Sequence, residues 1–195
     1  MNGIPYFTTT YVGENPPGRM FMIPEYRLAV VREGTLKVPS KTISSPLSVY
    51  GFMKPITDDL DREVVFGIYL DQKNKIIGIN EISIGSLTEA VVHPREVLKP
   101  AIILNSAAMI IMHNHPSGDP APSRADMVLM KRLALASAVI GIRMIDFMVA
   151  GESFYYSATE SGTLPVISDH AELDRFLGYR ASTEYRTSLA AEQGS

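Results

Sequence analysis

The sequence predicts one layered α/β (α+β) domain built from mixed strands and helices. Three observations predict this fold class. β-rich runs and helical patterns occur together, two runs lie close enough in the chain to form a hairpin, and one run is apolar throughout, as in a strand buried on both faces. The chain has 195 residues, 46% of them hydrophobic and 20% charged, which is typical of a single globular domain.

We expect three parts along the chain. Residues 1–25 are rich in Gly, Pro and Thr and should form an irregular N-terminal arm, followed by the domain itself over residues 26–157. Residues 158–195 are mostly polar and should form a peripheral C-terminal tail with one short helix over residues 168–177.

The first predicted elements of the domain are a strand and a helix. Residues 26–31 can form a strand. Ser45 followed by Pro46 predicts the capped start of a helix, and Pro55 should end that helix.

A hairpin and a second helix should follow. The β-rich runs at residues 63–70 and 75–83 are joined by four residues ending in Asn74, which suits a left-handed turn position. The pair His93 and Pro94 then opens a helix that runs towards residue 105.

The remaining elements should complete the sheet. Residues 108–112 are continuously apolar and predict a buried strand. Residues 143–150 and 154–156 should form a closing hairpin around Gly151. Between them we expect a helix that Gly141 ends. Its apolar face consists of Val128, Leu129, Leu133, Ala136, Val139 and Ile140.

Composition excludes several kinds of chemistry. The chain contains no Cys, so it has no disulfide, no thiol nucleophile and no thiolate metal ligand, and the Pro-Cys-x-x-Cys zinc site of deaminases is excluded. The net charge is −3 and no segment is strongly basic, which disfavours a dedicated nucleic-acid-binding protein.

The sequence also predicts a cytoplasmic, soluble protein. No basic residue precedes Arg19, and the N-terminal region has no apolar run of the length that a secretory signal needs. The most apolar stretch, residues 100–112, is interrupted by Asn105 and Ser106 and is far shorter than the roughly 20 residues of a membrane span.

Candidate chemistry concentrates between His113 and Asp126. His113 and His115 are two residues apart at the end of a predicted strand, so their side chains point to the same side and can converge on one ion. Asp126 lies three residues after Ser123 at a predicted helix start, and the proline-rich loop can bring it back over the histidines. Two His and one carboxylate leave the fourth position of a tetrahedral zinc open, which is typical of catalytic sites.

Each half of this pattern also has an ordinary structural interpretation. His113 and His115 can be hydrogen-bonded residues at a strand end, and Ser123 with Asp126 can form a capping box. The two halves together at this spacing are much rarer by chance than either alone, which favours a metal site.

The spacing His-x-His-x7-Ser-x2-Asp resembles the JAMM signature of the JAB/MPN metallopeptidases. The fuller string HNHPSGDPAPSRAD, with VVHPREVLKPAI upstream, resembles the RadC branch of that family, over roughly residues 26–157. The resemblance implies an MPN/JAB domain, a mixed β-sheet flanked by helices with a cytidine-deaminase-like layered architecture. It also implies one zinc ion per chain, held by His113, His115 and Asp126.

The same resemblance implies two catalytic residues. Ser123 would help to stabilise an oxyanion. A glutamate at the start of an upstream strand would be the general acid/base, and Glu63, directly before VVFGIYL, occupies that place, with Glu81 and Glu96 as alternatives.

Five further polar residues have lesser expected roles. Asn114 and Ser117 can orient the loop or donate hydrogen bonds behind the ligands. Asp119 is expected to be a turn residue, His93 to cap a helix or pack at its start, and His170 to lie in the tail.

These features favour a zinc-dependent hydrolase, a JAMM metallopeptidase or isopeptidase in which zinc-bound water attacks an amide carbonyl of a peptide or isopeptide-linked protein. A RadC-like hydrolase or repair accessory that acts on DNA is the alternative. A catalytically silent MPN scaffold is disfavoured because no ligand is missing. We expect the N-terminal helix-hairpin-helix region of longer RadC proteins to be absent, and DNA binding should therefore be weak. The sequence predicts neither the physiological substrate nor the oligomeric state.

Overall fold

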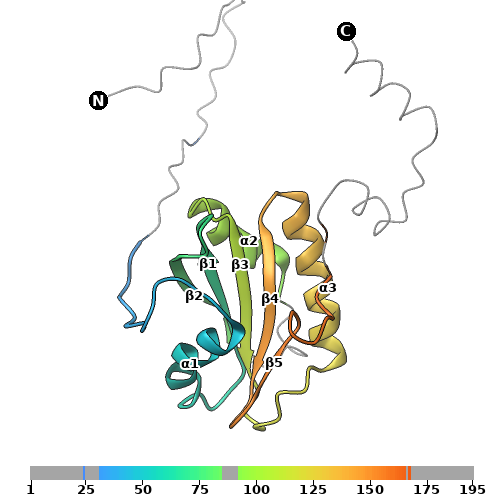
Figure 1. Cartoon of the computed structure of the whole chain (residues 1–195). Coiled ribbons are helices and arrows are strands. Elements are labelled where there is room, and N and C mark those ends of the chain that lie inside the picture. Colours follow the sequence, from blue (N-terminus) through green and yellow to red (C-terminus); the bar gives the residue numbers. More distant parts are fainter. Residues whose placement is uncertain (1–23, 25–30, 85–91, 166, 168–195) are drawn as a thin grey trace, which may run out of the picture.

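In a computed structural model of the chain, residues 24, 31–84, 92–165 and 167 are described. They form a three-layer α/β domain in which a mixed sheet lies between α1 on one face and α2 and α3 on the other (Figure 1). The predicted fold class is confirmed. The predicted strand at residues 26–31 and the predicted helix at 168–177 lie outside the described residues, except for Val31, which is exposed and belongs to no strand.

The described residues contain three helices and five strands, and the strands form one sheet in the order β2-β1-β3-β4-β5. β1 pairs antiparallel with β2 and with β3, β3 pairs parallel with β4, and β4 pairs antiparallel with β5. None of these three helices is long and apolar enough to cross a membrane. The elements are α1 (Pro46–Thr57), β1 (Val64–Leu70), β2 (Ile76–Ile84), α2 (Pro94–Ile103), β3 (Ala108–Asn114), α3 (Arg124–Val139), β4 (Arg143–Ala150) and β5 (Tyr155–Ser157).

The central strands β1 and β3 are buried at every position because helices cover both faces of the sheet. Alternate side chains of β3, such as Met109 and Ile111, face the core under α2 and α3, whereas Ile110 and Met112 face the core under α1. The same alternation directs His113 towards the α2 and α3 side. The His113 side chain, at the end of β3, therefore lies on the face of the sheet that α3 covers.

Helix α1 begins as predicted but ends later. The Ser45 side chain accepts a hydrogen bond from the Ser48 amide and caps the helix. The prediction that Pro55 ends the helix was wrong, because α1 continues to Thr57. Pro55 lies in the last turn, where its missing N–H removes only one hydrogen bond, and the Asp58 amide still donates to the Lys54 carbonyl.

The hairpin between β1 and β2 is confirmed. The connecting turn places Asn74 at a φ of 56°, the left-handed conformation that asparagine tolerates well. The Asp71 carboxylate accepts hydrogen bonds from the amides of Lys73 and Lys75 and closes the turn.

Helix α3 buries a different face from the one predicted. Leu129 and Leu133 are buried as expected, but Val128, Val139 and Ile140 are 51%, 62% and 42% exposed. The buried face also includes polar residues. A prediction based on apolar residues alone therefore placed the buried face at the wrong position around the helix. The buried positions on this helix are Asp126, Leu129, Met130, Leu133, Ala134 and Ser137.

Packing continues past the last strand. Ala158 is fully buried in the core under α2 and α3, and Leu164 packs against the same core. The hydroxyl of Ser157 and the amide of Thr159 both donate to the buried carboxylate of Asp146 on β4. The first residues after β5 are therefore tied to the sheet.

Candidate metal centre

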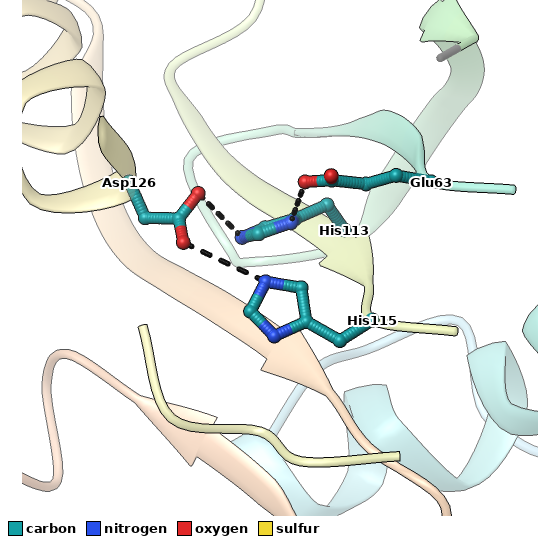
Figure 2. A group of neighbouring side chains, drawn as sticks. All are labelled: Glu63, His113, His115 and Asp126. Atoms are coloured by element: carbon teal, nitrogen blue, oxygen red, sulfur yellow. Dashed lines mark hydrogen bonds and ion pairs between the residues drawn. The ribbon is translucent and has the colours of Figure 1, made fainter. Parts of the chain in front are cut away.

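One end of the sheet brings together Glu63, His113, His115 and Asp126 (Figure 2). One nitrogen or oxygen atom from each of these side chains lies within 4.8 Å of the others. Within the described part of the chain, this is the one group of three or more such residues that could hold a metal ion. The three predicted ligands and the predicted general base thus lie together.

Strand register places Glu63 beside His113. β1 and β3 are antiparallel with Val65 opposite His113, so the start of β1 lies next to the end of β3. Glu63 is the residue before β1, and its carboxylate oxygen Oε1 lies 2.9 Å from His113 Nδ1. The two residues are 50 positions apart in the chain, so only the sheet brings them together.

The loop after β3 is seated on the turn between β4 and β5. The His115 amide donates to the Ala150 carbonyl, and the Glu152 amide donates to the Gly118 carbonyl. A Cβ atom at Gly151 would lie 2.4 Å from that Gly118 oxygen and 2.8 Å from Pro120 Cδ. The close approach requires glycine at this position.

Hydrogen bonds to the Nδ1 atoms orient both imidazoles. His113 Nδ1 meets Glu63 Oε1 at 2.9 Å, and His115 Nδ1 meets the backbone oxygen of Asp119 at 2.8 Å. A carboxylate and a carbonyl only accept hydrogen bonds, so each neutral ring must carry its proton on Nδ1. The lone pairs on Nε2 are left for another partner, as in histidines that bind metals.

Both Nε2 atoms face the Asp126 carboxylate. His113 Nε2 lies 3.4 Å from Asp126 Oδ1, and His115 Nε2 lies 3.6 Å from Asp126 Oδ2. Figure 2 shows the carboxylate of Asp126 directed at the two rings from the start of α3. The two rings meet edge to face with centroids 4.9 Å apart, and the His113 ring also contacts Phe147.

A divalent cation fits this geometry. His113 Nε2 and Asp126 Oδ1 are buried and have no hydrogen-bond partner among the described residues. Buried polar atoms normally have a hydrogen-bond partner, so the lack of one here favours a cation as the partner of these two atoms. Ligand atoms about 2.0–2.1 Å from a tetrahedral zinc are separated by roughly 3.4 Å, which is close to the observed spacings of 3.4 and 3.6 Å.

The charge state of the group favours a cation. Burial alone would raise the pKa of Asp126, but His115, His113 and the Ser123 backbone and hydroxyl together lower that pKa to about 2. The Asp126 carboxylate beside Nε2 raises the pKa of His115, against the opposing effect of burial. Asp126 is therefore anionic at neutral pH, as a metal ligand must be.

Ser123 occupies the N-cap of α3. Its side chain accepts a hydrogen bond from the Asp126 amide at 3.2 Å, and Asp126 Oδ2 accepts from the Ser123 amide at 2.7 Å. The capping box and the ligand group are thus both present in the structure. The cap orients the Asp126 carboxylate, since the hydrogen bond to Oδ2 limits its rotation.

Asn114 and Ser117 differ in their relation to the site. Asn114 is buried; its Oδ1 accepts a hydrogen bond from the Val64 amide at 2.9 Å, and its Nδ2 donates to the Arg62 carbonyl at 3.0 Å. These backbone groups lie on either side of Glu63. Ser117 is exposed in the turn, and no contact within the described part of the chain joins it to the four side chains.

The alternative glutamates lie elsewhere. Glu81 is exposed on β2, and Glu96 is paired with Arg95 and Lys99 in the first turn of α2. Of the three glutamates considered from the sequence, Glu63 alone lies in the group.

Of the expected roles of His93 and Asp119, the structure confirms only that of Asp119. His93 stands at the N-cap of α2, but its side chain is exposed and makes no capping hydrogen bond, so a capping role was wrong. Asp119 is a turn residue, as predicted, and its carboxylate accepts from the Ala121 amide. Its backbone oxygen, the partner of His115, was not predictable from the sequence, because a main-chain atom is the same in every residue type. His170 lies outside the described residues.

The RadC-like JAB domain family matches residues 43–163 of the chain. The chain belongs to this family. The match covers all the described helices and strands and the four side chains of the group. The predicted RadC branch of the JAB/MPN family is confirmed, and the family indicates a hydrolase of the JAMM type.

Curated relatives of the chain are UPF0758 proteins from archaea and bacteria. The protein of Methanosarcina mazei is 40% identical over 137 residues, which are 70% of this chain and 60% of the relative. That of Desulforamulus reducens is 43% identical over 130 residues, 65% of this chain and 57% of the relative. That of Rubrobacter xylanophilus is 42% identical over 138 residues, 71% of this chain and 59% of the relative. The chain therefore spans about six-tenths of the length of these relatives.

Proposed function

We propose that this protein is a zinc-dependent amide hydrolase, a JAMM metallopeptidase or isopeptidase that acts on a peptide or an isopeptide-linked protein. The observation that carries the proposal is a pair of buried atoms, His113 Nε2 and Asp126 Oδ1, which have no hydrogen-bond partner in the described part of the chain and lie at the spacing of tetrahedral ligands. Two imidazoles and one carboxylate without thiolate suit zinc and leave one position open.

The bound ion would supply Lewis acidity, which polarises a carbonyl group and lowers the pKa of water. The protein would hold it through His113 Nε2, His115 Nε2 and the Asp126 carboxylate. The hydrogen bonds on the two Nδ1 atoms keep both rings in the required orientation before any substrate arrives.

We assign proton transfer to the Glu63 carboxylate. It is 16% exposed, so it borders the site without being sealed from it. A carboxylate at this place can accept a proton from the attacking water and give it to the leaving amine. Its hydrogen bond with His113 Nδ1 holds it beside the ligand group.

Ser123 can assist through its hydroxyl hydrogen. The hydroxyl oxygen accepts the capping bond from the Asp126 amide, but a serine hydroxyl can donate as well as accept. The residue is exposed at the N-terminus of α3, where donors favour a developing negative charge on a substrate oxygen.

The test is a parallel substrate screen. The zinc-loaded wild type, Glu63→Gln and the exposed control Glu81→Gln are incubated with peptide libraries, isopeptide-linked substrates, and single- and double-stranded DNA. We expect Glu63→Gln to retain zinc and lose amide hydrolysis, because an amide cannot accept the proton, and Glu81→Gln to match the wild type. Zinc-dependent DNA cleavage that Glu63→Gln abolishes, with no peptide or isopeptide cleaved, would reverse the proposal in favour of the DNA-acting alternative.

A further inference from the structure

We propose that Asn114 is a positioning residue: its side-chain amide holds the backbone on both sides of Glu63 and so fixes the Glu63 carboxylate against His113. The functional consequence rests on the role proposed above for Glu63. The structural part rests on contacts alone.

Asn114 continues the pairing of β1 with β3 beyond the last backbone pair. The regular register between these strands ends at Val65 opposite His113. At the next position the Asn114 side chain takes over, because Oδ1 accepts from the Val64 amide and Nδ2 donates to the Arg62 carbonyl. The side chain therefore acts as one more peptide group at the end of the ladder.

Asparagine suits this place for a chemical reason. A carboxamide presents a donor and an acceptor on one planar group, as a peptide bond does, and the two backbone groups of β1 need one of each. Aspartate of the same shape keeps the acceptor but has no donor when ionised. Alanine at 114 would leave both the Val64 amide and the Arg62 carbonyl without this partner, at a buried position only 4% exposed.

The two hydrogen bonds matter because of what lies between them. Glu63 precedes the first residue of β1, and the two residues before it, Asp61 and Arg62, are exposed and pair with each other. The Asn114 bonds therefore anchor the backbone at the point where an exposed segment enters the sheet. The anchored backbone sets where the Glu63 side chain starts on its path to His113 Nδ1.

A chain of contacts follows from this arrangement. Asn114 holds the backbone at Glu63, Glu63 Oε1 accepts from His113 Nδ1, and His113 Nε2 faces Asp126. Asn114 itself contributes no atom to the ligand group. The orientation of one ligand thus depends on a residue that lies between the two histidines in sequence and acts through a strand 50 residues away.

The experiment measures the tautomer of His113 and the zinc affinity of the protein. Long-range ¹H–¹⁵N NMR of the metal-free protein reports the His113 tautomer and its Nδ1–H signal, and competition with a chelator gives the zinc affinity. The variants are Asn114→Ala and, as the matched control, Tyr69→Phe. The control removes a buried hydrogen bond from Tyr69 on β1, the strand that Glu63 precedes, to the Val97 carbonyl, without touching Glu63.

We expect Asn114→Ala to lose the protected Nδ1–H signal of His113 and to bind zinc about 10- to 100-fold more weakly. Tyr69→Phe should lose stability yet keep the wild-type signal and affinity. If Asn114→Ala does not fold, Asn114→Asp takes its place, because it keeps the Val64 bond and repels the Arg62 carbonyl.

An Asn114 variant with the wild-type signal and affinity would overturn the proposal, and so would equal losses in Tyr69→Phe. Neither readout involves substrate turnover. Failure of the proposed hydrolase function would therefore leave this test intact.

Discussion

Two buried aspartates, Asp126 and Asp146, have opposite electrostatic surroundings. Burial raises the pKa of Asp146, even though its carboxylate accepts hydrogen bonds from the Phe147 amide, the Thr159 amide and the Ser157 hydroxyl. Burial also acts to raise the pKa of Asp126, but its histidine neighbours and Ser123 lower it to about 2.

The difference teaches that burial of a carboxylate does not by itself indicate a site. Asp146 is surrounded by neutral protein donors and has the role of a structural link between β4 and the residues after β5. Asp126 faces two imidazole nitrogens, and its Oδ1 lacks a hydrogen-bond partner among the described residues. The nature of the partners separates a structural carboxylate from a prospective metal ligand.

The largest expected effect is on metal binding at Asp126. Asp126→Ala removes a direct ligand, so zinc affinity should fall by more than the roughly 100-fold that loss of an outer partner can cost. The free energy of unfolding of the metal-free protein should fall by about 1–2 kcal/mol, because the Ser123 amide loses its acceptor and the two histidines lose a carboxylate neighbour. Elemental analysis and urea unfolding measure the two quantities. Full zinc content in Asp126→Ala would contradict the assignment.

Asp146→Ala should show the converse pattern. It leaves three donors without their acceptor, two of them buried, so the free energy of unfolding should fall by about 3 kcal/mol. Zinc bound per folded chain should stay at the wild-type level, since the Asp146 carboxylate contacts none of the ligands. Urea denaturation with zinc analysis of the folded fraction checks both. Loss of zinc with unchanged stability would show that Asp146, like Asp126, contributes to metal binding.

A smaller effect is expected from the turn that supports His115. Gly151→Ala would drive a Cβ against Gly118 and Pro120 and shift the Asp119 carbonyl away from His115 Nδ1, weakening zinc binding about 10-fold. The control is Gly51→Ala in α1, where a Cβ meets nothing within 4 Å. It should keep the affinity and gain up to about 1 kcal/mol of stability. Competition with a chelator measures the zinc affinity of both variants. Equal affinities would show that the turn at Gly151 does not support His115.

The smallest effect concerns acid stability of the metal-free protein. The lowered pKa of Asp126 stabilises the fold above its ordinary value of 3.8, and this contribution is lost as pH falls towards about 2. The raised pKa of Asp146 has the opposite sign, because acidification relieves the cost of burying its charge.

The melting temperature followed from neutral to acidic pH tests both signs. Asp126→Asn should lose less stability than the wild type between pH 3.8 and about 2. Asp146→Asn should lose more than the wild type as the pH falls towards 3.8, because it lacks the relief. Parallel curves for the wild type and both variants would show that neither carboxylate is coupled to folding in this way.

Features formed by residues close together in the chain could be predicted from the sequence. The prospective ligands His113, His115 and Asp126 lie on one short segment, so their spacing alone indicated the group. The hairpin at Asn74 was predictable for the same reason. The buried face of α3 was not, because Asp126 is polar and a hydrophobic pattern does not count it as buried. The contact of Asn114 with the backbone beside Glu63 depends on the register of two strands distant in the chain, which one sequence does not reveal.

The positions of the four side chains along the chain also bear on the order of folding. The three prospective ligands can meet once the end of β3, its loop and the first turn of α3 have formed, and closing so short a loop costs little chain entropy. Glu63 arrives only when β1 pairs with β3 across 50 residues, a non-local contact that forms more slowly. Capture of an ion at the proposed zinc site can therefore precede the arrival of the Glu63 carboxylate. In the proposed enzyme, a refolding chain that has taken up zinc would therefore gain its proton-transfer group only when β1 pairs with β3.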